Sequence, residues 1–186
     1  MLIRIFDISI SFLALLFLSP LIILIYCIVF FDNKSPFFFQ ERVGKDIKKF
    51  NLIKFRTMLP GTNSCATHLV DPSRVTFTGN FLRKSKLDEI PQLWNVLIGE
   101  MSLVGPRPER PVFIEKFKSQ IPNYMLRHKV KAGITGWAQI NGWRGNTSLE
   151  KRIEFDLYYI ERWSIWLDIK ILLLTLIRGF FNPHAY

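Results

Sequence analysis

The chain has 186 residues, 49% of them hydrophobic and 15% aromatic, and a net charge of +10. This length holds one domain and an appendage, and the basic excess indicates an anionic partner such as nucleic acid, lipid headgroups or a phosphorylated substrate. The two cysteines, Cys27 and Cys65, lie far apart with no Cys/His cluster, which excludes a zinc site or a disulfide framework and suits a reducing compartment.

An uncharged apolar run covers residues 8–31 near the start of the chain. As a helix it would extend roughly 36 Å, enough to cross a hydrocarbon core; it is too long for a signal peptide, so we expect it to be retained. Pro20 cannot donate to the Leu16 carbonyl, and the Ser19 hydroxyl can satisfy that oxygen instead. The length favours a kinked spanning helix, and the alternative is a helix that turns back at the Ser19-Pro20 break.

Two extended segments follow, at residues 36–44 and 50–58, the second of which alternates with period two. This alternation puts Lys54 and Arg56 on one side of the strand. With Arg42 across a turn they predict a phosphate cradle, unless they are simply a solvated strand face. Residues 60–75 predict a polar surface loop that contains His68.

A helix is expected over residues 87–98 and closed by Gly99, with an apolar face made of Leu87, Ile90, Leu93, Trp94 and Leu97. Two adjacent acids, Asp88 and Glu89, stand among several cations at its start. One carboxylate can attack phosphorus or hold a metal while cations neutralise the phosphate oxygens. The alternative is a helix start in which the acids only meet the helix dipole. The following prolines hold the backbone stiffly, so that Arg107 can be aimed at a phosphate.

The remaining third of the chain predicts helices over residues 112–117 and 148–162, with a Gly-rich loop over 133–145 between them. That loop could approach a ligand closely and stack Trp or Arg planes on a base, but it contains neither a P-loop nor a dinucleotide fingerprint. Residues 163–181 predict an amphipathic helix lying in a membrane interface, or a buried core helix.

Taken in order, several motifs resemble those of the bacterial sugar transferase family, the monotopic phosphoglycosyl transferases. After the Ser-Pro helix, the matching stretches are residues 40–44, 53–58, 87–93, 101–108, 133–142 and 155–159. Ile90 stands where the family usually has Leu, and Lys86 where a small hydroxyl residue is frequent. Neither departure removes a reactive group.

The resemblance implies an α+β, mainly helical fold of the family's minimal form. Residues 1–34 would form a re-entrant membrane helix broken at Ser19 and Pro20. Residues 35–186 would form a small catalytic domain with short strands and interfacial amphipathic helices, on the cytoplasmic face of the bacterial inner membrane. Residues 178–186 resemble the ending of the exopolysaccharide-initiating branch.

The resemblance also implies the reaction: transfer of a sugar 1-phosphate from a UDP-sugar to polyprenol (undecaprenyl) phosphate, with Mg²⁺ and release of UMP. The residues it implies are Asp88 as nucleophile, Glu89 as magnesium ligand, Arg107, Arg42 and Lys54 as phosphate-binding groups, Asp156 as a further acid of unassigned role, and Arg144 as a weaker nucleotide contact. Glucose, galactose and N-acetylated sugars all stay open, as does the oligomeric state. A membrane-tethered nucleic-acid-binding module or a scaffold is the alternative, and neither would need Asp88.

Overall fold

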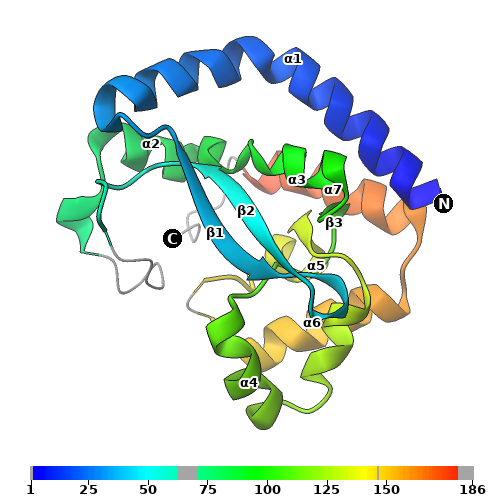
Figure 1. The fold of residues 1–186 in the computed structure, drawn as a ribbon. Coiled ribbons are helices and arrows are strands. Elements are labelled where there is room, and N and C mark those ends of the chain that lie inside the picture. The colour runs from blue at the N-terminus through cyan, green and yellow to red at the C-terminus, as the bar shows by residue number, and fades with distance from the viewer. Residues whose placement is uncertain (1, 63–70, 146, 180–186) are drawn as a thin grey trace.

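The computed structural model describes residues 2–62, 71–145 and 147–179, which form a mainly helical α+β structure with two small sheets (Figure 1). The elements in order are α1 (Leu2–Asn33), β1 (Phe37–Val43), β2 (Lys49–Phe55), α2 (Phe77–Ser85), α3 (Gln92–Ile98), β3 (Ser102–Val104), α4 (Pro111–Gln120), β4 (Gly133–Thr135), α5 (Trp137–Ile140), α6 (Leu149–Glu161) and α7 (Ile165–Gly179). The predicted mainly helical class, with a few short strands and a long apolar helix at the N-terminus, is confirmed. His68 and Cys65 of the predicted loop, and residues 180–186 of the chain's ending, lie outside the described residues.

Helix α1 is continuous through Pro20 and arches over the rest of the molecule (Figure 1). The Ser19 hydroxyl donates to the Leu16 carbonyl at 2.8 Å, as the sequence predicts for the oxygen that Pro20 cannot reach. In the described part of the chain, α1 is the one helix long and apolar enough to cross a membrane. Its middle faces outward, and the side chain of Phe17 is 78% exposed.

The first turns of α1 are fastened to the domain by two charged side chains. The Arg4 guanidinium donates to the last carbonyls of α3, those of Val96 (2.5 Å) and Leu97 (2.7 Å). The Val96 carbonyl also accepts from the Gly99 N–H that caps the helix, at 3.0 Å, and a cation here meets the negative end of the helix dipole. The buried Asp7 carboxylate accepts hydrogen bonds from Ser102 Oγ and from a backbone N–H of β3, each at 3.0 Å.

The last turns of α1 rest on the same domain. Ile25 and Val29 are buried in a cluster with Phe55 of β2 and Leu82 of α2. Burying an aliphatic side chain of this size contributes about 1.5–3 kcal/mol. Both ends of the apolar helix are therefore packed on one domain, while its middle is left uncovered.

Strands β1 and β2 form the antiparallel hairpin that the sequence predicts, with Arg42 opposite Phe50 and Phe38 opposite Lys54. The backbone of β2 is also held from α3. The Asn95 side chain accepts from the Ile53 N–H at 3.1 Å and donates to the Asn51 carbonyl at 2.8 Å. These two hydrogen bonds fix the start of α3 against the strand that carries Lys54.

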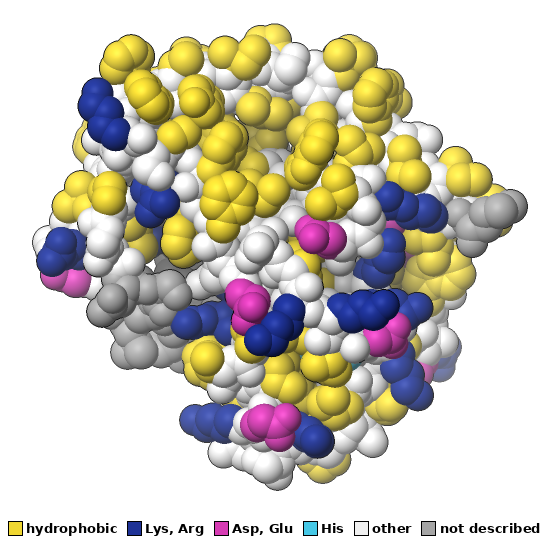
Figure 2. Space-filling model, in the orientation of Figure 1, with side chains coloured by type: hydrophobic (Ala, Val, Ile, Leu, Met, Phe, Trp, Pro, Cys, Tyr) yellow, Lys and Arg dark blue, Asp and Glu magenta, His cyan; other side chains and the backbone are white. Residues whose placement is uncertain are grey.

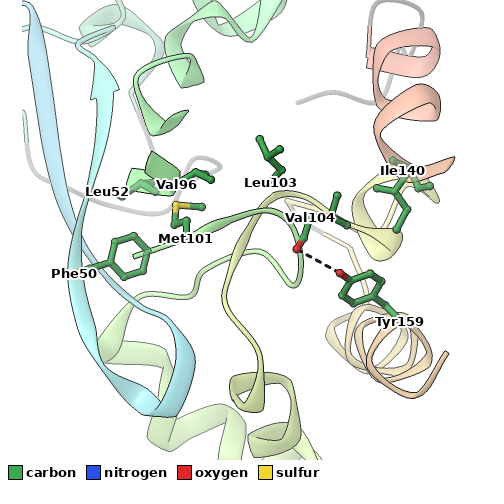
Figure 3. Close-up of a cluster of buried hydrophobic side chains, with 9 residues drawn as sticks. Phe50, Leu52, Val96, Met101, Leu103, Val104, Ile140 and Tyr159 are labelled. Atoms are coloured by element: carbon green, nitrogen blue, oxygen red, sulfur yellow. Dashed lines mark hydrogen bonds between the residues drawn. The ribbon is translucent and has the colours of Figure 1, made fainter. Parts of the chain in front are cut away.

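The main core lies between the hairpin, α3, the second sheet and the C-terminal helices (Figure 3). Its buried members are Phe50, Leu52, Val96, Met101, Leu103, Val104, Ile140, Tyr159 and Ile171. The Tyr159 hydroxyl donates to Asp168 at 2.8 Å and lies 3.4 Å from the Val104 carbonyl, so the polar end of this side chain is satisfied.

The face that α3 buries differs from the face that the sequence predicts. Trp94 was expected on the apolar face, but its side chain is 51% exposed, whereas the amides of Gln92 and Asn95 are buried. The reason is the pair of hydrogen bonds from Asn95 to β2, which turns that side of the helix inward. A hydrophobic pattern alone gives no weight to such a polar contact.

The Gly-rich segment predicted as a ligand loop is instead β4 followed by α5. A Cβ on Gly133 would lie 2.1 Å from the Gly105 N, and one on Gly136 would lie 2.2 Å from the Gly105 carbonyl oxygen. These glycines allow the backbones at β3 and β4 to meet. The Trp137 ring stacks on Tyr158 of α6, with centroids 5.7 Å apart.

Helix α7 is buried along one side, as the core-helix alternative for residues 163–181 predicts. Ile171 is fully buried in the core, whereas Trp166 and Leu176 are 76% and 63% exposed. The helix is therefore a core element on one side and leaves a second apolar side uncovered.

Candidate active site

The two acids of the predicted site lie in the short connection between α2 and α3. Lys86 takes a left-handed conformation (φ 58°) that ends α2, and residues Leu87–Glu89 form a 3₁₀ turn. Pro91 has no N–H, so the chain passes through it with tight i→i−3 hydrogen bonds before α3 begins. The single helix expected over residues 87–98 is therefore divided, and Asp88 and Glu89 precede its α-helical part.

Glu89 is held by two cations from separate elements. Lys54 of β2 lies 2.6 Å from Glu89 Oε1, and Arg107 Nη2 lies 2.7 Å from the same oxygen. Burial raises the pKa of Glu89, but the charges and hydrogen bonds of Arg107 and Lys54 outweigh it and hold that pKa well below its usual range. Glu89 is therefore ionised and already neutralised by its neighbours.

Arg107 reaches Glu89 from the loop that follows β3. Its Nη1 also donates to Gln139 Oε1 at 3.1 Å, and the Arg127 side chain donates to its backbone carbonyl at 2.9 Å. Position 105 requires glycine, because the Cβ of any other residue would lie 2.5 Å from the Lys131 carbonyl oxygen. The rigid loop inferred from the prolines therefore brings Arg107 to the acid pair.

Asp88 differs from Glu89 in having no hydrogen bond or ion pair to any of the described residues. Burial raises the pKa of its carboxyl to about 6, and the adjacent Glu89 charge adds to the effect, against the opposing charges of Lys54, Arg83 and Arg107. At neutral pH Asp88 is thus an ionised carboxylate with high proton affinity and unused lone pairs. That is the condition required of a carboxylate nucleophile.

Arg42 carries a charge that its own contacts do not neutralise. Its Nε donates to Gln40 Oε1 at 3.1 Å and its Nη1 to the Pro108 carbonyl at 3.1 Å, and both acceptors are neutral. Burial and the nearby Arg107 lower the pKa of this guanidinium to about 10, so it stays protonated at neutral pH. The structure thus brings Arg42, Lys54 and Arg107 together.

Arg144 and Asp156 have different neighbours. The Arg144 charge is close enough to Lys86 to lower the pKa of that amine, after the larger effect of burial, so Arg144 lies near the connection that carries the acids. Asp156 is instead buried in α6 and ion-paired with Arg127 at 2.8 Å. It lies behind the Arg107 loop.

Sequence reasoning missed Arg127 and Gln139 as parts of the site. Gln139 lies inside a stretch that matches the family, although no property of the single residue marks it. Arg127 looked like one cation in a basic segment, but Tyr124, Arg127 and His128 share the helical spacing of one face, and all three are buried. That spacing is the signal that could have identified Arg127.

The surroundings of Glu89, the expected magnesium ligand, show which of its oxygens is already used. Its Oε1 atom already accepts from Lys54 and Arg107. Within the described ranges, no group of three His, Cys, Asp or Glu side chains is placed to hold a metal. Glu89 Oε2 lies 3.5 Å from Arg107 Nη1 and is the oxygen of this side chain that could serve a metal, since Mg²⁺ is usually held by one or two carboxylates together with substrate phosphates.

The arrangement suits phosphate-transfer chemistry, because it combines a carboxylate without a described partner, a neutralised neighbour and clustered cations on a domain that carries a long apolar helix. A family model described as bacterial sugar transferase matches residues 1–182. The chain belongs to the bacterial sugar transferase family.

Three curated relatives illustrate the similarity. A UDP-glucose:undecaprenyl-phosphate glucose-1-phosphate transferase of Escherichia coli (strain K12) is 50% identical, over 97% of this chain and 40% of that protein. The sugar transferase EpsL of Bacillus subtilis (strain 168), named as uncharacterized, is 45% identical, over 92% of this chain and 84% of that protein. A UDP-N-acetylgalactosamine-undecaprenyl-phosphate N-acetylgalactosaminephosphotransferase of Aeromonas hydrophila is 38% identical, over 94% of this chain and 43% of that protein. The chain spans about two fifths of the length of the first and third of these relatives.

Proposed function

We propose that this chain transfers a sugar 1-phosphate from a UDP-sugar to undecaprenyl phosphate, as the first membrane step of exopolysaccharide or other surface-glycan assembly. The observation that carries the proposal is the contrast within the acid pair. Glu89 is neutralised by Lys54 and Arg107, whereas Asp88 has no partner among the described residues and a pKa of about 6. Family membership and the names of the relatives support the same reaction class.

In the proposed mechanism an Asp88 carboxylate oxygen attacks the phosphorus that carries the sugar. The Asp88 O–P bond forms, the bond from phosphorus to the bridging oxygen breaks, and UMP leaves with that electron pair. A phosphate oxygen of undecaprenyl phosphate then attacks the same phosphorus, and Asp88 leaves as a carboxylate. Both steps are balanced without a proton donor.

The cations have distinct places in this scheme. Lys54 and Arg107 hold Glu89 ionised beside the nucleophile. The hydrogen-bond partners of Arg42 among the described residues are neutral, so its charge is available for the diphosphate of the donor. Arg144, close to Lys86, is proposed to face the nucleotide part.

Magnesium dependence stays a prediction of the family resemblance, and no step above runs through the metal. Chelation with EDTA followed by re-addition of Mg²⁺ tests it directly. UMP release that persists in EDTA would contradict the requirement.

We further propose that α1 is re-entrant and that the domain works at the cytoplasmic face of the inner membrane. The support is that Arg4 and Asp7 at one end, and Val29 at the other, contact the same domain, so a helix entering lipid would have to return to the side it left. Hydrophobic side chains gather over the α1 side of the molecule, and most charged side chains lie over the opposite half (Figure 2). Phe77 of α2, 92% exposed, adds to the uncovered apolar surface.

Cysteine labelling tests the topology. Single cysteines at Leu2 and Asp71, both exposed, would be introduced after replacing Cys27 and Cys65 with alanine. A re-entrant helix predicts that a membrane-impermeant reagent labels both positions from the cytoplasmic side only. Labelling of the two positions from opposite sides of the membrane would contradict the re-entrant topology and support a spanning helix.

The activity test is UMP release from a panel of UDP-sugars with undecaprenyl phosphate in membranes or detergent. UDP-glucose and UDP-N-acetylgalactosamine come first, since relatives are named for these donors. Asp88→Asn should abolish release, and the matched control Asp71→Asn, on an exposed loop, should keep it. The proposal fails if the wild type releases no UMP with any donor, or if Asp88→Asn matches it. Salt-sensitive nucleic-acid binding in place of turnover would favour the alternative.

A further inference from the structure

Asp156 is buried away from the acid pair, and among the described residues its ion pair is with Arg127. Arg127 Nε lies 3.0 Å and Nη2 lies 2.8 Å from Asp156 Oδ2. The Arg127 side chain is 1% exposed and the Asp156 side chain is 3% exposed. Because the pair is buried, removing either partner would leave the other charge buried and unpaired, which is strongly unfavourable.

The same guanidinium also holds the loop that carries the candidate phosphate-binding arginine. Arg127 Nη2 donates to the Arg107 backbone carbonyl at 2.9 Å. The Arg107 side chain then contacts Glu89 at 2.7 Å and Gln139 at 3.1 Å. A continuous series of contacts therefore runs from Asp156 through Arg127 and Arg107 to the acid pair.

Glu109 adds a second carboxylate to this series. Its Oε2 lies 3.9 Å from Arg127 Nη1 and 3.8 Å from Arg152 Nη1. Burial lowers the pKa of Arg127, but the Asp156 and Glu109 charges outweigh it and raise that pKa, so the guanidinium stays charged. The planar fork of an arginine can hold a carboxylate and a carbonyl together, which a single ammonium group does less well.

We propose that Arg127 is a positioning residue for Arg107 and that Asp156 acts through Arg127 rather than on substrate or metal. In this account Asp156 fixes the orientation of Arg127, and Arg127 fixes the backbone from which Arg107 reaches Glu89. The proposal deepens the transfer reaction proposed above and rests on it for its kinetic test.

A double-mutant cycle on UMP release separates indirect from direct action. Asp156→Asn should slow the wild-type enzyme by about 10–100-fold, as is typical when the partner of a ligand-positioning group is lost. In an Arg107→Ala background the same change should cost less than about threefold, because the group it positions is gone. A direct role for Asp156 predicts that the two effects multiply. The control Glu154→Gln removes an exposed pair with Lys151 on the same helix and should leave the rate unchanged.

Amide hydrogen exchange of the full chain gives a readout that does not need turnover. Peptides covering residues 105–110 should exchange faster in Asp156→Asn than in the wild type or Glu154→Gln, while peptides from α7 should not change. If Asp156→Asn does not fold, Arg127→Lys replaces it in both experiments, since it keeps the charge but loses the fork.

Non-additive rates together with faster exchange in residues 105–110 support the positioning role. Effects that multiply, or exchange that does not change, overturn it. If the wild type releases no UMP, the proposed transfer fails on its own, and the exchange measurement still decides whether Asp156 and Arg127 order the Arg107 loop.

Discussion

Replacing Asp88 with asparagine should stabilise the folded protein while removing the proposed nucleophile. Burial and the Glu89 charge raise the pKa of Asp88 from 3.8 to about 6, so the ionised carboxylate costs folding free energy at neutral pH. A shift of this size corresponds to about 3 kcal/mol at about 1.4 kcal/mol per pKa unit. Because the side chain is only partly buried, we expect about 1–2 kcal/mol. For a chain of this length that is an increase in Tm of about 2–8 °C.

The pH dependence of this gain has a definite sign. The folded state binds the Asp88 proton more tightly than the unfolded state, so the cost is absent below about pH 4 and complete above about pH 6. Thermal unfolding of the full chain in detergent, at about pH 4.5 and about pH 7.5, should therefore show a gap between variant and wild type that grows as the pH rises. The reasoning would be refuted if Asp88→Asn had a Tm equal to or below that of the wild type at the higher pH, or if the difference in Tm between the two proteins did not change with pH.

Glu89→Gln is the control of opposite sign. Although burial raises the pKa of Glu89, Arg107 and Lys54 hold it well below the usual range, so its ionised form stabilises the folded state. That contribution is present above the unfolded-state pKa and is lost as the pH falls through the folded-state pKa. The variant should unfold at a lower temperature than the wild type at about pH 7.5.

Three further predictions concern the rate and the packing. With Asp88 as the attacking group, initial rates of UMP release should rise about tenfold per pH unit below about pH 6 and level off above it; a flat profile over that range would argue against this nucleophile. Gly133→Ala should lower the free energy of unfolding by at least about 2 kcal/mol in a denaturant titration, because its Cβ would lie 2.1 Å from the Gly105 N. The control Gly61→Ala has nothing within 4 Å of the added methyl and should lower that free energy by about 1 kcal/mol. Asp7→Ala should cost about 1–3 kcal/mol and speed amide exchange in β3, because it leaves the buried donors there without an acceptor; unchanged exchange would mean that Asp7 does not fasten α1.

Local patterns predicted much of the fold. The period-two alternation identified the strand that carries Lys54, and the helix predicted over residues 148–162 is α6, whose first turn the Ser148 hydroxyl caps by accepting from the Lys151 N–H. The prolines around Arg107 predicted a stiff loop. These features depend on a few neighbouring residues, and for that reason they can be read from the sequence.

The parts that escaped prediction depend on contacts between distant segments. Trp94 was assigned to the wrong side of α3 because Asn95 bonds to the backbone of β2. Gly133 was interpreted as a ligand-facing glycine because the approach of the Gly105 backbone exists only in the folded chain. Arg127 was passed over because burial with Asp156, far along the sequence, is what distinguishes it from the other cations.

Within the candidate site, the sequence identified the acid pair and three of its cations, and the structure adds which acid is free. The residue types alone treat Asp88 and Glu89 as equivalent neighbours, and it is the family resemblance that implies Asp88 as the nucleophile. The difference arises because Lys54 and Arg107 converge on Glu89 from β2 and from the loop after β3. This asymmetry supports Asp88 as the attacking group.

The most direct test of that assignment is intact-protein mass spectrometry of the enzyme mixed with a UDP-sugar in the absence of undecaprenyl phosphate. The account predicts a mass increase equal to one sugar phosphate, located on Asp88 by peptide mapping, absent from Asp88→Asn and discharged when undecaprenyl phosphate is added. An adduct that forms equally on Asp88→Asn, or rapid UMP release with no adduct on a trapped wild-type enzyme, would contradict it.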